Sequence, residues 1–180
     1  MAELRIALNN IAPEGKTFVM DDPAIWSVPM TECGMDCRIV QPLVGTVTLF
    51  PQEDGCLVRG NLKGEVVVPC NRCAEDAHLI IDSSFDSFEP FPQADDEPEP
   101  RNGKEKPFDS EADELIVKLV DGAPEINLAG LLWEEFVLAL PVRPLCKPDC
   151  KGLCPDCGKN LNEGSCSCVR DEGDPRLAAL

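Results

Sequence analysis

The chain has 180 residues, of which 43% are hydrophobic and 5% aromatic, with no tyrosine, so aliphatic side chains must fill its core. Its net charge is −17. Residues 143–180 carry six basic and six acidic side chains, so the whole net negative charge lies in residues 1–142. This charge argues against a protein that grips DNA or RNA over a broad basic face.

The first ninety residues are expected to form an antiparallel sheet. Residues 3–8 alternate in hydropathy as an opening strand does, whereas the prolines and glycine of residues 9–38 predict irregular connections. Residues 37–50 and 55–70 are rich in β-branched side chains and are separated by a turn-forming stretch, which predicts a long hairpin. Residues 77–88 extend the same sheet.

The composition changes sharply over residues 90–114, where proline and acidic side chains dominate. Such a stretch cannot bury enough apolar area to offset the entropy lost on ordering, so we expect an acidic linker or mobile loop. Residues 115–120 then predict a short strand, and residues 121–125 predict a turn.

Residues 128–140 predict a helix that is apolar on most sides and therefore buried against the sheet. Asn127 is suited to cap its first N–H groups, and Pro141 ends it at Leu140. Trp133 and Phe136 are expected in the core.

Together these patterns predict an α+β fold, with a mainly antiparallel β-sheet packed by one buried helix over residues 1–142. A cysteine-rich, zinc-ribbon-like tail is expected over residues 143–180, which hold six of the eleven cysteines. No apolar run is long enough to span a membrane, and the first residues do not resemble a secretory signal. We therefore expect the reducing cytoplasm, where thiols stay free or bind metal.

The spacing of the tail cysteines indicates metal binding. Cys154 and Cys157 form a Cys-x2-Cys pair followed by glycine, a turn that aims two thiolates at one point. Cys166 and Cys168 return after a short loop and could complete the tetrahedron of sulfurs that Zn²⁺ prefers.

Four further cysteines predict a second site of the same kind. Cys70 and Cys73 form another Cys-x2-Cys pair at the end of the predicted hairpin, and Cys146 and Cys150 follow the predicted helix. Joining these two pairs would fasten the tail to the sheet.

Other readings of the cysteines stay open at this point. One alternative is a single zinc held by Cys150, Cys154, Cys157 and one of the last two cysteines. An iron–sulfur cluster is less favoured, although all-thiolate sites can hold either metal. The three remaining cysteines, Cys33, Cys37 and Cys56, are expected to act as small buried hydrophobic residues. The alternatives for Cys33 and Cys37 are an isolated surface feature or an additional thiol pair.

Catalytic motifs are missing from the sequence. The only histidine, His78, has no recognisable catalytic partner, and no phosphate-cradling loop or nucleophile elbow is present. A zinc ion with four thiolates has no open position for water. We therefore expect a protein that is not an enzyme.

Four segments together resemble the YceD-like family of bacteria and plastids: "PCNRC", "LAGLLWEEFVLALPVRPLC", "CKGLCPDCGKNLNEGSCSC" and "DPRLAAL". The resemblance covers roughly residues 40–180 and is most specific at the C-terminal end. It implies that Cys70 and Cys73 match the family's C-x-R-C motif and that Cys146 and Cys150 match the pair after its helix. The roles of Asp174, Pro175 and Arg176, which match the family's end, are not implied.

The resemblance implies a non-enzymatic factor in ribosomal RNA accumulation or processing, and so in large-subunit biogenesis. The net negative charge favours ribosome-assembly or rRNA-processing proteins as partners. Precursor rRNA could be contacted through residues 143–180, which carry no net charge. A thiol-based redox or metal-responsive regulator is the alternative.

Overall fold

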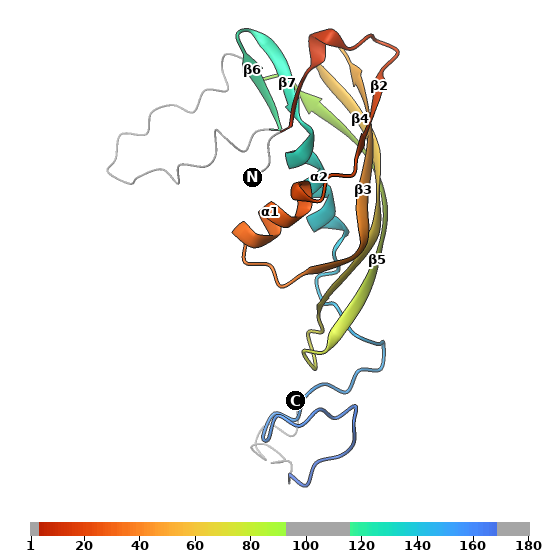
Figure 1. Ribbon diagram of the computed structural model, residues 1–180, viewed down its shortest axis with the longest axis vertical. Helices are drawn as coiled ribbons and strands as arrows, with labels where there is room; N and C mark the ends of the chain where they lie inside the picture. The colour runs from red at the N-terminus through yellow and green to blue at the C-terminus, as the bar shows by residue number, and fades with distance from the viewer. Residues whose placement is uncertain (1–3, 93–115, 169–180) are drawn as a thin grey trace, which may run out of the picture.

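The computed structural model describes residues 4–92 and 116–168, which form two antiparallel sheets and two α-helices (Figure 1). In chain order the elements are β1 (Arg5–Ala7), the 3-10 helix η1 (Leu8–Asn10), β2 (Lys16–Met20), α1 (Ala24–Glu32), β3 (Arg38–Pro51), β4 (Gly55–Pro69), β5 (Asp76–Pro90), β6 (Val117–Val120), β7 (Ala123–Asn127) and α2 (Leu128–Ala139). The predicted α+β class is confirmed. Neither helix of the described ranges is long and apolar enough to cross a membrane.

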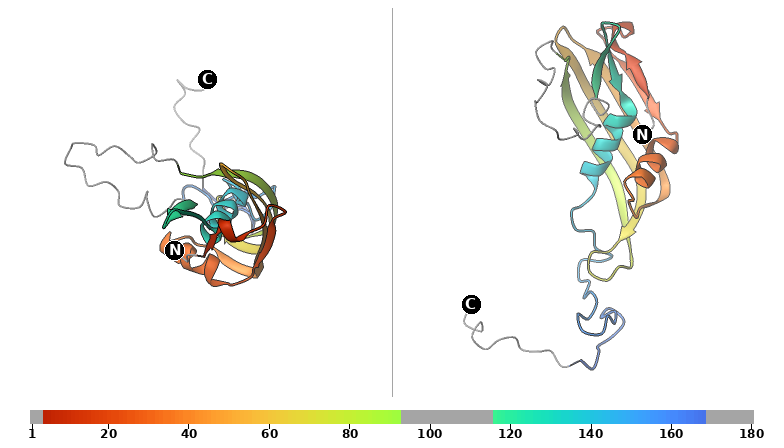
Figure 2. Two further views of the ribbon diagram at one scale, coloured as in Figure 1. Left: turned by 90° about the horizontal axis from the view of Figure 1, so that it is seen from above. Right: turned by 90° about the vertical axis from the view of Figure 1, so that its left-hand side faces the viewer.

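The larger sheet has the strand order β2-β3-β4-β5, with every neighbouring pair antiparallel. It contains the predicted hairpin as β3 and β4, and the predicted extension as β5. The sheet curves around the two helices, as the view from above shows (Figure 2). The loop between β4 and β5, residues 70–75, projects beyond the helices and carries the first cysteine pair (Figure 1).

The core lies between α2 and the concave face of this sheet. Leu132 and Phe136 of α2 are fully buried, and a side chain at Gly45 of β3 would meet Leu132 within 2.7 Å. Trp26 of α1 lies 5.9 Å from Phe136 between ring centroids, and its indole N–H donates to the carbonyl of Leu43 at 3.1 Å. Helix α1 therefore closes the side of the core.

The smaller sheet, with strand order β1-β7-β6, leads the chain into α2. At the junction, Asn127 is buried, and its side-chain oxygen accepts from the N–H groups of Gly130 at 3.2 Å and Leu4 at 3.3 Å. The predicted N-cap is confirmed. The predicted turn is shorter than residues 121–125, because β7 already begins at Ala123.

The convex face of the larger sheet carries charged or hydrogen-bonded pairs between strands. Each pair joins oppositely charged or hydrogen-bonding residues on different strands: Arg38 with Asp76, Lys63 with Asp82, Arg59 with Asp86, and His78 with Glu65. His78 lies on this exposed face of β5, as expected. Because basic side chains here have acidic partners, the convex face offers little free positive charge.

Residues 9–38 were expected to be irregular, and this prediction is wrong. They contain the last two residues of η1 and the whole of β2 and α1. Strand β2 is only five residues long, and Pro29 lies inside α1, where a proline normally predicts a helix end. Helix α2 is also less enclosed than expected, because Val137 and Leu138 near its end are 42% and 77% exposed.

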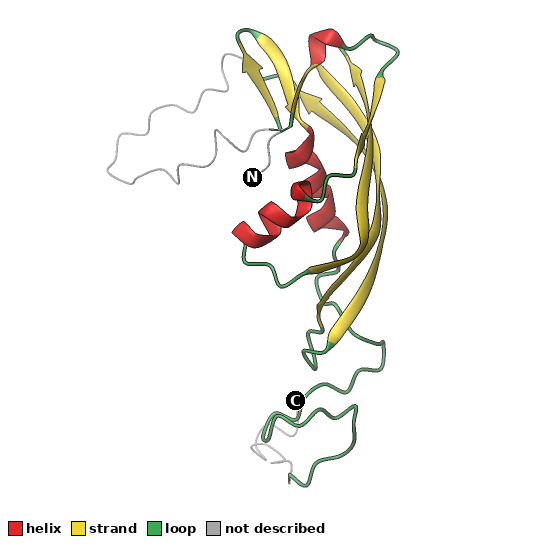
Figure 3. Ribbon diagram, in the orientation of Figure 1, coloured by secondary structure: helices red, strands yellow, loops and turns green. Residues whose placement is uncertain are grey.

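From residue 140 to 168 the described chain has no helix or strand, and a single bridge joins Leu153 and Asn160 (Figure 3). The division into a core over residues 1–142 and a tail over residues 143–180 stays a prediction. The acidic linker at about residues 90–114 falls almost wholly outside the described residues, as do Asp174, Pro175 and Arg176.

Candidate metal centres

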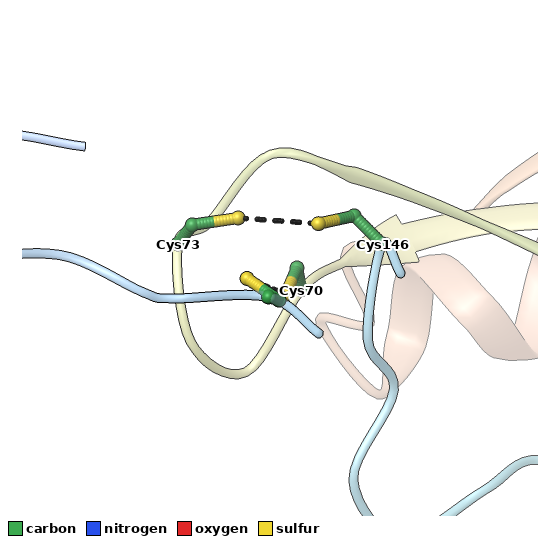
Figure 4. A group of neighbouring side chains, drawn as sticks. Cys70, Cys73 and Cys146 are labelled. Atoms are coloured by element: carbon green, nitrogen blue, oxygen red, sulfur yellow. Dashed lines mark hydrogen bonds between the residues drawn. The ribbon is translucent and has the colours of Figure 1, made fainter. Parts of the chain in front are cut away.

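The loop between β4 and β5 and the segment after α2 bring four thiols together. We call Cys70, Cys73, Cys146 and Cys150 the first cluster; their sulfur atoms all lie within 4.8 Å of one another. The Cys70–Cys150 and Cys73–Cys146 sulfur distances are 3.8 and 3.5 Å. Sulfurs placed about 2.3 Å from a central ion in a tetrahedron would be about 3.8 Å apart. Figure 4 shows Cys70, Cys73 and Cys146 approaching one another from the two chain segments.

The tail forms a similar arrangement from its own residues. We call Cys154, Cys157, Cys166 and Cys168 the second cluster, and their sulfurs also lie within 4.8 Å of one another. The Cys166–Cys154 sulfur distance is 3.5 Å. The structure therefore groups the eight cysteines into the two sets that the spacing predicted, although metal ligation by them stays a prediction.

The two Cys-x2-Cys turns close with the same pair of backbone hydrogen bonds. The donors and acceptors are Cys70 N–H to Glu75 O (2.8 Å), Ala74 N–H to Cys70 O (2.9 Å), Cys154 N–H to Lys159 O (2.8 Å) and Gly158 N–H to Cys154 O (2.9 Å). The fifth residue of each turn is left-handed, with φ of 60° at Ala74 and 71° at Gly158. Glycine suits this conformation, which explains why the second turn was easier to recognise from its sequence.

In the first cluster, the local environment gives the thiols different pKa values. Burial alone would raise the pKa of Cys70. The backbone N–H groups of Cys146, Arg72 and Cys73, which point at its sulfur, have the larger combined effect and lower the pKa to about 6. Burial and the neighbouring thiols raise the pKa of Cys146 to about 12. Four adjacent thiolates repel one another, so complete ionisation of the cluster calls for a bound cation.

The second cluster shows the same contrast. The backbone N–H groups of Cys157 and Asp156 lower the pKa of Cys154 to about 7. The Cys157 thiol and burial together raise the pKa of Cys168 to about 12. Each cluster thus offers four sulfur donors, which suit a soft or borderline cation such as Zn²⁺; an ion held by all four would have no position open for a reacting water.

Hydrogen bonds around the first cluster join the tail to the tip of the β4–β5 hairpin. The backbone N–H of Asn71 donates to the carbonyl of Pro144 at 2.9 Å, and the N–H of Leu153 donates to the carbonyl of Arg72 at 3.0 Å. The Arg72 guanidinium donates to the carbonyl of Cys150 at 2.7 Å. Sequence reasoning missed Arg72, although its place between two candidate ligands was a signal that could have singled it out.

The other three cysteines differ from one another. Cys56 is fully buried, and this burial raises the pKa of its thiol to about 11. Cys37 is half-buried. Cys33 is exposed at the end of α1, so the expectation that it would be a buried hydrophobic residue is wrong.

Thiol labelling should separate burial from metal protection. With both clusters filled, a soluble alkylating reagent should modify Cys33 rapidly and Cys56 not at all. Cys157 is exposed, so only a bound metal would protect it, and a chelator should make it reactive while Cys56 stays protected. Peptide mass spectrometry of timed samples checks this; equal labelling of Cys157 with and without chelator would contradict the prediction.

The fold and the clusters define a class of protein: an antiparallel α+β chain with two four-cysteine groups that could hold metal ions, one shared between the β4–β5 loop and the segment after α2 and one within the tail. The chain belongs to the family described as "Large ribosomal RNA subunit accumulation protein YceD", whose model matches residues 58–180. That description names the accumulation of an RNA and not a chemical reaction. The matched region contains all eight clustered cysteines.

Two relatives illustrate the likeness. The chain is 25% identical over 152 residues to "Large ribosomal RNA subunit accumulation protein YCED homolog 1, chloroplastic" of Arabidopsis thaliana, covering 77% of this chain and 47% of that protein. It is 30% identical over 129 residues to an uncharacterized protein of Mycobacterium tuberculosis, covering 71% of this chain and 55% of that protein. The chain therefore spans about half the length of these curated relatives. No solved structure matches it.

Proposed function

We propose that this chain is a non-enzymatic factor in ribosomal RNA accumulation and large-subunit biogenesis, with a tail stabilised by structural zinc. The observation that carries the proposal is the family match, because it covers the region where the eight cysteines converge. The name of the chloroplast relative, a large ribosomal RNA subunit accumulation protein, supports the same role. We further propose that the protein acts in the cytoplasm, the reducing compartment where its thiols could hold metal.

Two zinc ions, one in each cluster, fit the donor set best. Zn²⁺ is redox-inert and is held in closed tetrahedral sites by four thiolates, whose binding energy then adds to folding. The residues that would hold the ions are Cys70, Cys73, Cys146 and Cys150 in the first cluster, and Cys154, Cys157, Cys166 and Cys168 in the second. An iron–sulfur cluster would also use four thiolates, so elemental analysis for zinc and iron is needed to distinguish it from a zinc ion.

The charge of the chain favours a protein partner. A net charge of −17 repels RNA, and each filled cluster would add about two more negative charges, since four thiolates surround one divalent ion. The convex face of the sheet has its basic side chains paired with acidic ones. We therefore propose a basic ribosome-assembly or rRNA-processing protein as the direct partner.

Contact with precursor rRNA is proposed only for the cluster end of the molecule. Among the described residues, the basic side chains at that end are Arg72, Arg143, Lys147, Lys151 and Lys159. Two of them are already engaged in hydrogen bonds, Arg72 with the Cys150 carbonyl and Lys159 with the Ser165 carbonyl. Within the described part of the tail, this leaves a small basic surface, suited to a few phosphate contacts.

Affinity purification from native lysate, with and without RNase, tests the proposal. We expect large-subunit assembly or processing proteins to be retained after RNase treatment, because the proposed contact is between proteins. Purified protein should bind precursor rRNA weakly, with a shallow dependence on salt. Tight binding with a steep salt dependence, or loss of all partners after RNase, would contradict the proposed mode of contact.

A further inference from the structure

A side chain from the second cluster's loop reaches the first cluster. Residues 158–165 connect Cys157 to Cys166, and the loop folds back so that the N–H of Leu161 donates to the carbonyl of Gly152 at 2.9 Å. Asn162, half-buried in this loop, donates from its side-chain Nδ2 to the sulfur of Cys150 at 3.3 Å. Cys150 itself is only 1% exposed.

The orientation of the Asn162 amide is fixed by its other hydrogen bonds. The backbone N–H of Lys151 donates to its Oδ1 at 2.9 Å, so the carbonyl must face Lys151. The Nδ2 group also donates to the Asn160 Oδ1 at 2.9 Å. One amide hydrogen therefore serves Asn160 and the other serves the Cys150 sulfur.

From this geometry we infer that Asn162 is a positioning residue for Cys150 and makes the two metal centres interdependent. The inference rests on the proposed metal centres and adds a residue that holds no metal itself. A hydrogen bond to a thiolate orients the sulfur and offsets part of its negative charge, as partners of metal ligands generally do. The loop that supplies this bond is anchored at both ends by ligands of the second cluster.

Filling the second cluster should therefore strengthen metal binding at the first. An ion bound by Cys157 and Cys166 would hold the ends of the loop and keep Asn162 against Cys150. Because coupling between binding sites is reciprocal, an ion in the first cluster should favour the second by the same factor.

The test is Asn162→Asp in the full chain, loaded with ¹¹³Cd²⁺ and examined by ¹¹³Cd NMR. Aspartate keeps the oxygen that accepts from Lys151 but replaces the donor to sulfur with a carboxylate oxygen. The matched control is Ser165→Asp, which adds the same charge to an exposed position of the same loop. Cys70→Ser and Cys157→Ser variants assign the two cadmium signals to the first and second clusters.

We expect Asn162→Asp to shift the first cluster's signal and to weaken its metal affinity about 10- to 100-fold in chelator competition. Ser165→Asp should do neither. An unchanged first-cluster signal with unchanged affinity in Asn162→Asp would overturn the inference while leaving the metal centres intact. Wild-type protein that gives no cadmium signal and binds no metal would instead overturn the proposed centres, and the inference with them.

Discussion

Replacing Cys70 and Cys73 with serine is expected to halve the metal content and to release the tail from the β4–β5 hairpin. Both thiols are 3% exposed and supply half of the first cluster's donors. Binding of a structural zinc ion contributes about 10–16 kcal/mol in small zinc-finger peptides, so losing the ion removes the strongest force holding this contact. The hydrogen bonds from Asn71 to Pro144 and from Leu153 to Arg72 should then open.

Hydrogen exchange by mass spectrometry, together with metal analysis, measures this effect. Peptides from residues 70–75 and 142–153 should exchange much faster in the double variant, and one ion should remain per chain. Peptides from α2 and β3 should change little, because the main core contains none of the eight clustered cysteines. Cys33→Ser, at an exposed position, is the matched control. Unchanged protection around the hairpin tip would show that metal does not hold the tail there.

Trp26→Ala is expected to cause the largest loss of stability within the core. The side chain is fully buried, lies against Phe136 and donates to the carbonyl of Leu43. Truncation leaves a large cavity and an acceptor without its donor, at a cost of about 3–5 kcal/mol in the free energy of unfolding. This is a large share of the 5–15 kcal/mol typical of a folded domain.

Urea unfolding in a zinc-buffered solution measures this loss as a lower midpoint with a similar slope. Val19→Ala is the control, since Val19 is 63% exposed and its truncation should cost less than about 0.5 kcal/mol. A Trp26→Ala protein that unfolds within about 1 kcal/mol of the wild type would mean that α1 does not seal the core.

The β-sheet could be predicted because its long strands carry their own signals. Strands β3 and β4 are rich in β-branched side chains, and the turn between them is short and polar. Helix α1 could not be predicted in the same way, because its helical state depends on packing Trp26 against α2, which outweighs the local preference of Pro29. Cys33 was misjudged for a related reason: its exposure depends on where α1 ends.

The grouping of the eight cysteines into two sets could be predicted from the sequence, whereas the hydrogen bonds that other residues make to these sets could not. Close spacing along the chain identifies the Cys-x2-Cys pairs, and the lack of other donors suggests which pairs combine. The partnership of Asn162 with Cys150 spans 12 residues and arises from the fold of a loop, so no local pattern reveals it. Arg72 reaches the tail across 78 residues for the same reason.

X-ray absorption at the zinc edge on natively purified protein tests most directly whether two closed zinc–thiolate centres hold this tail. We predict two zinc ions per chain, each surrounded by four sulfur atoms at about 2.3 Å, with no nitrogen or oxygen neighbours and no iron. Protein that contains no zinc, or zinc bound mainly by oxygen or nitrogen, would contradict the existence of these centres.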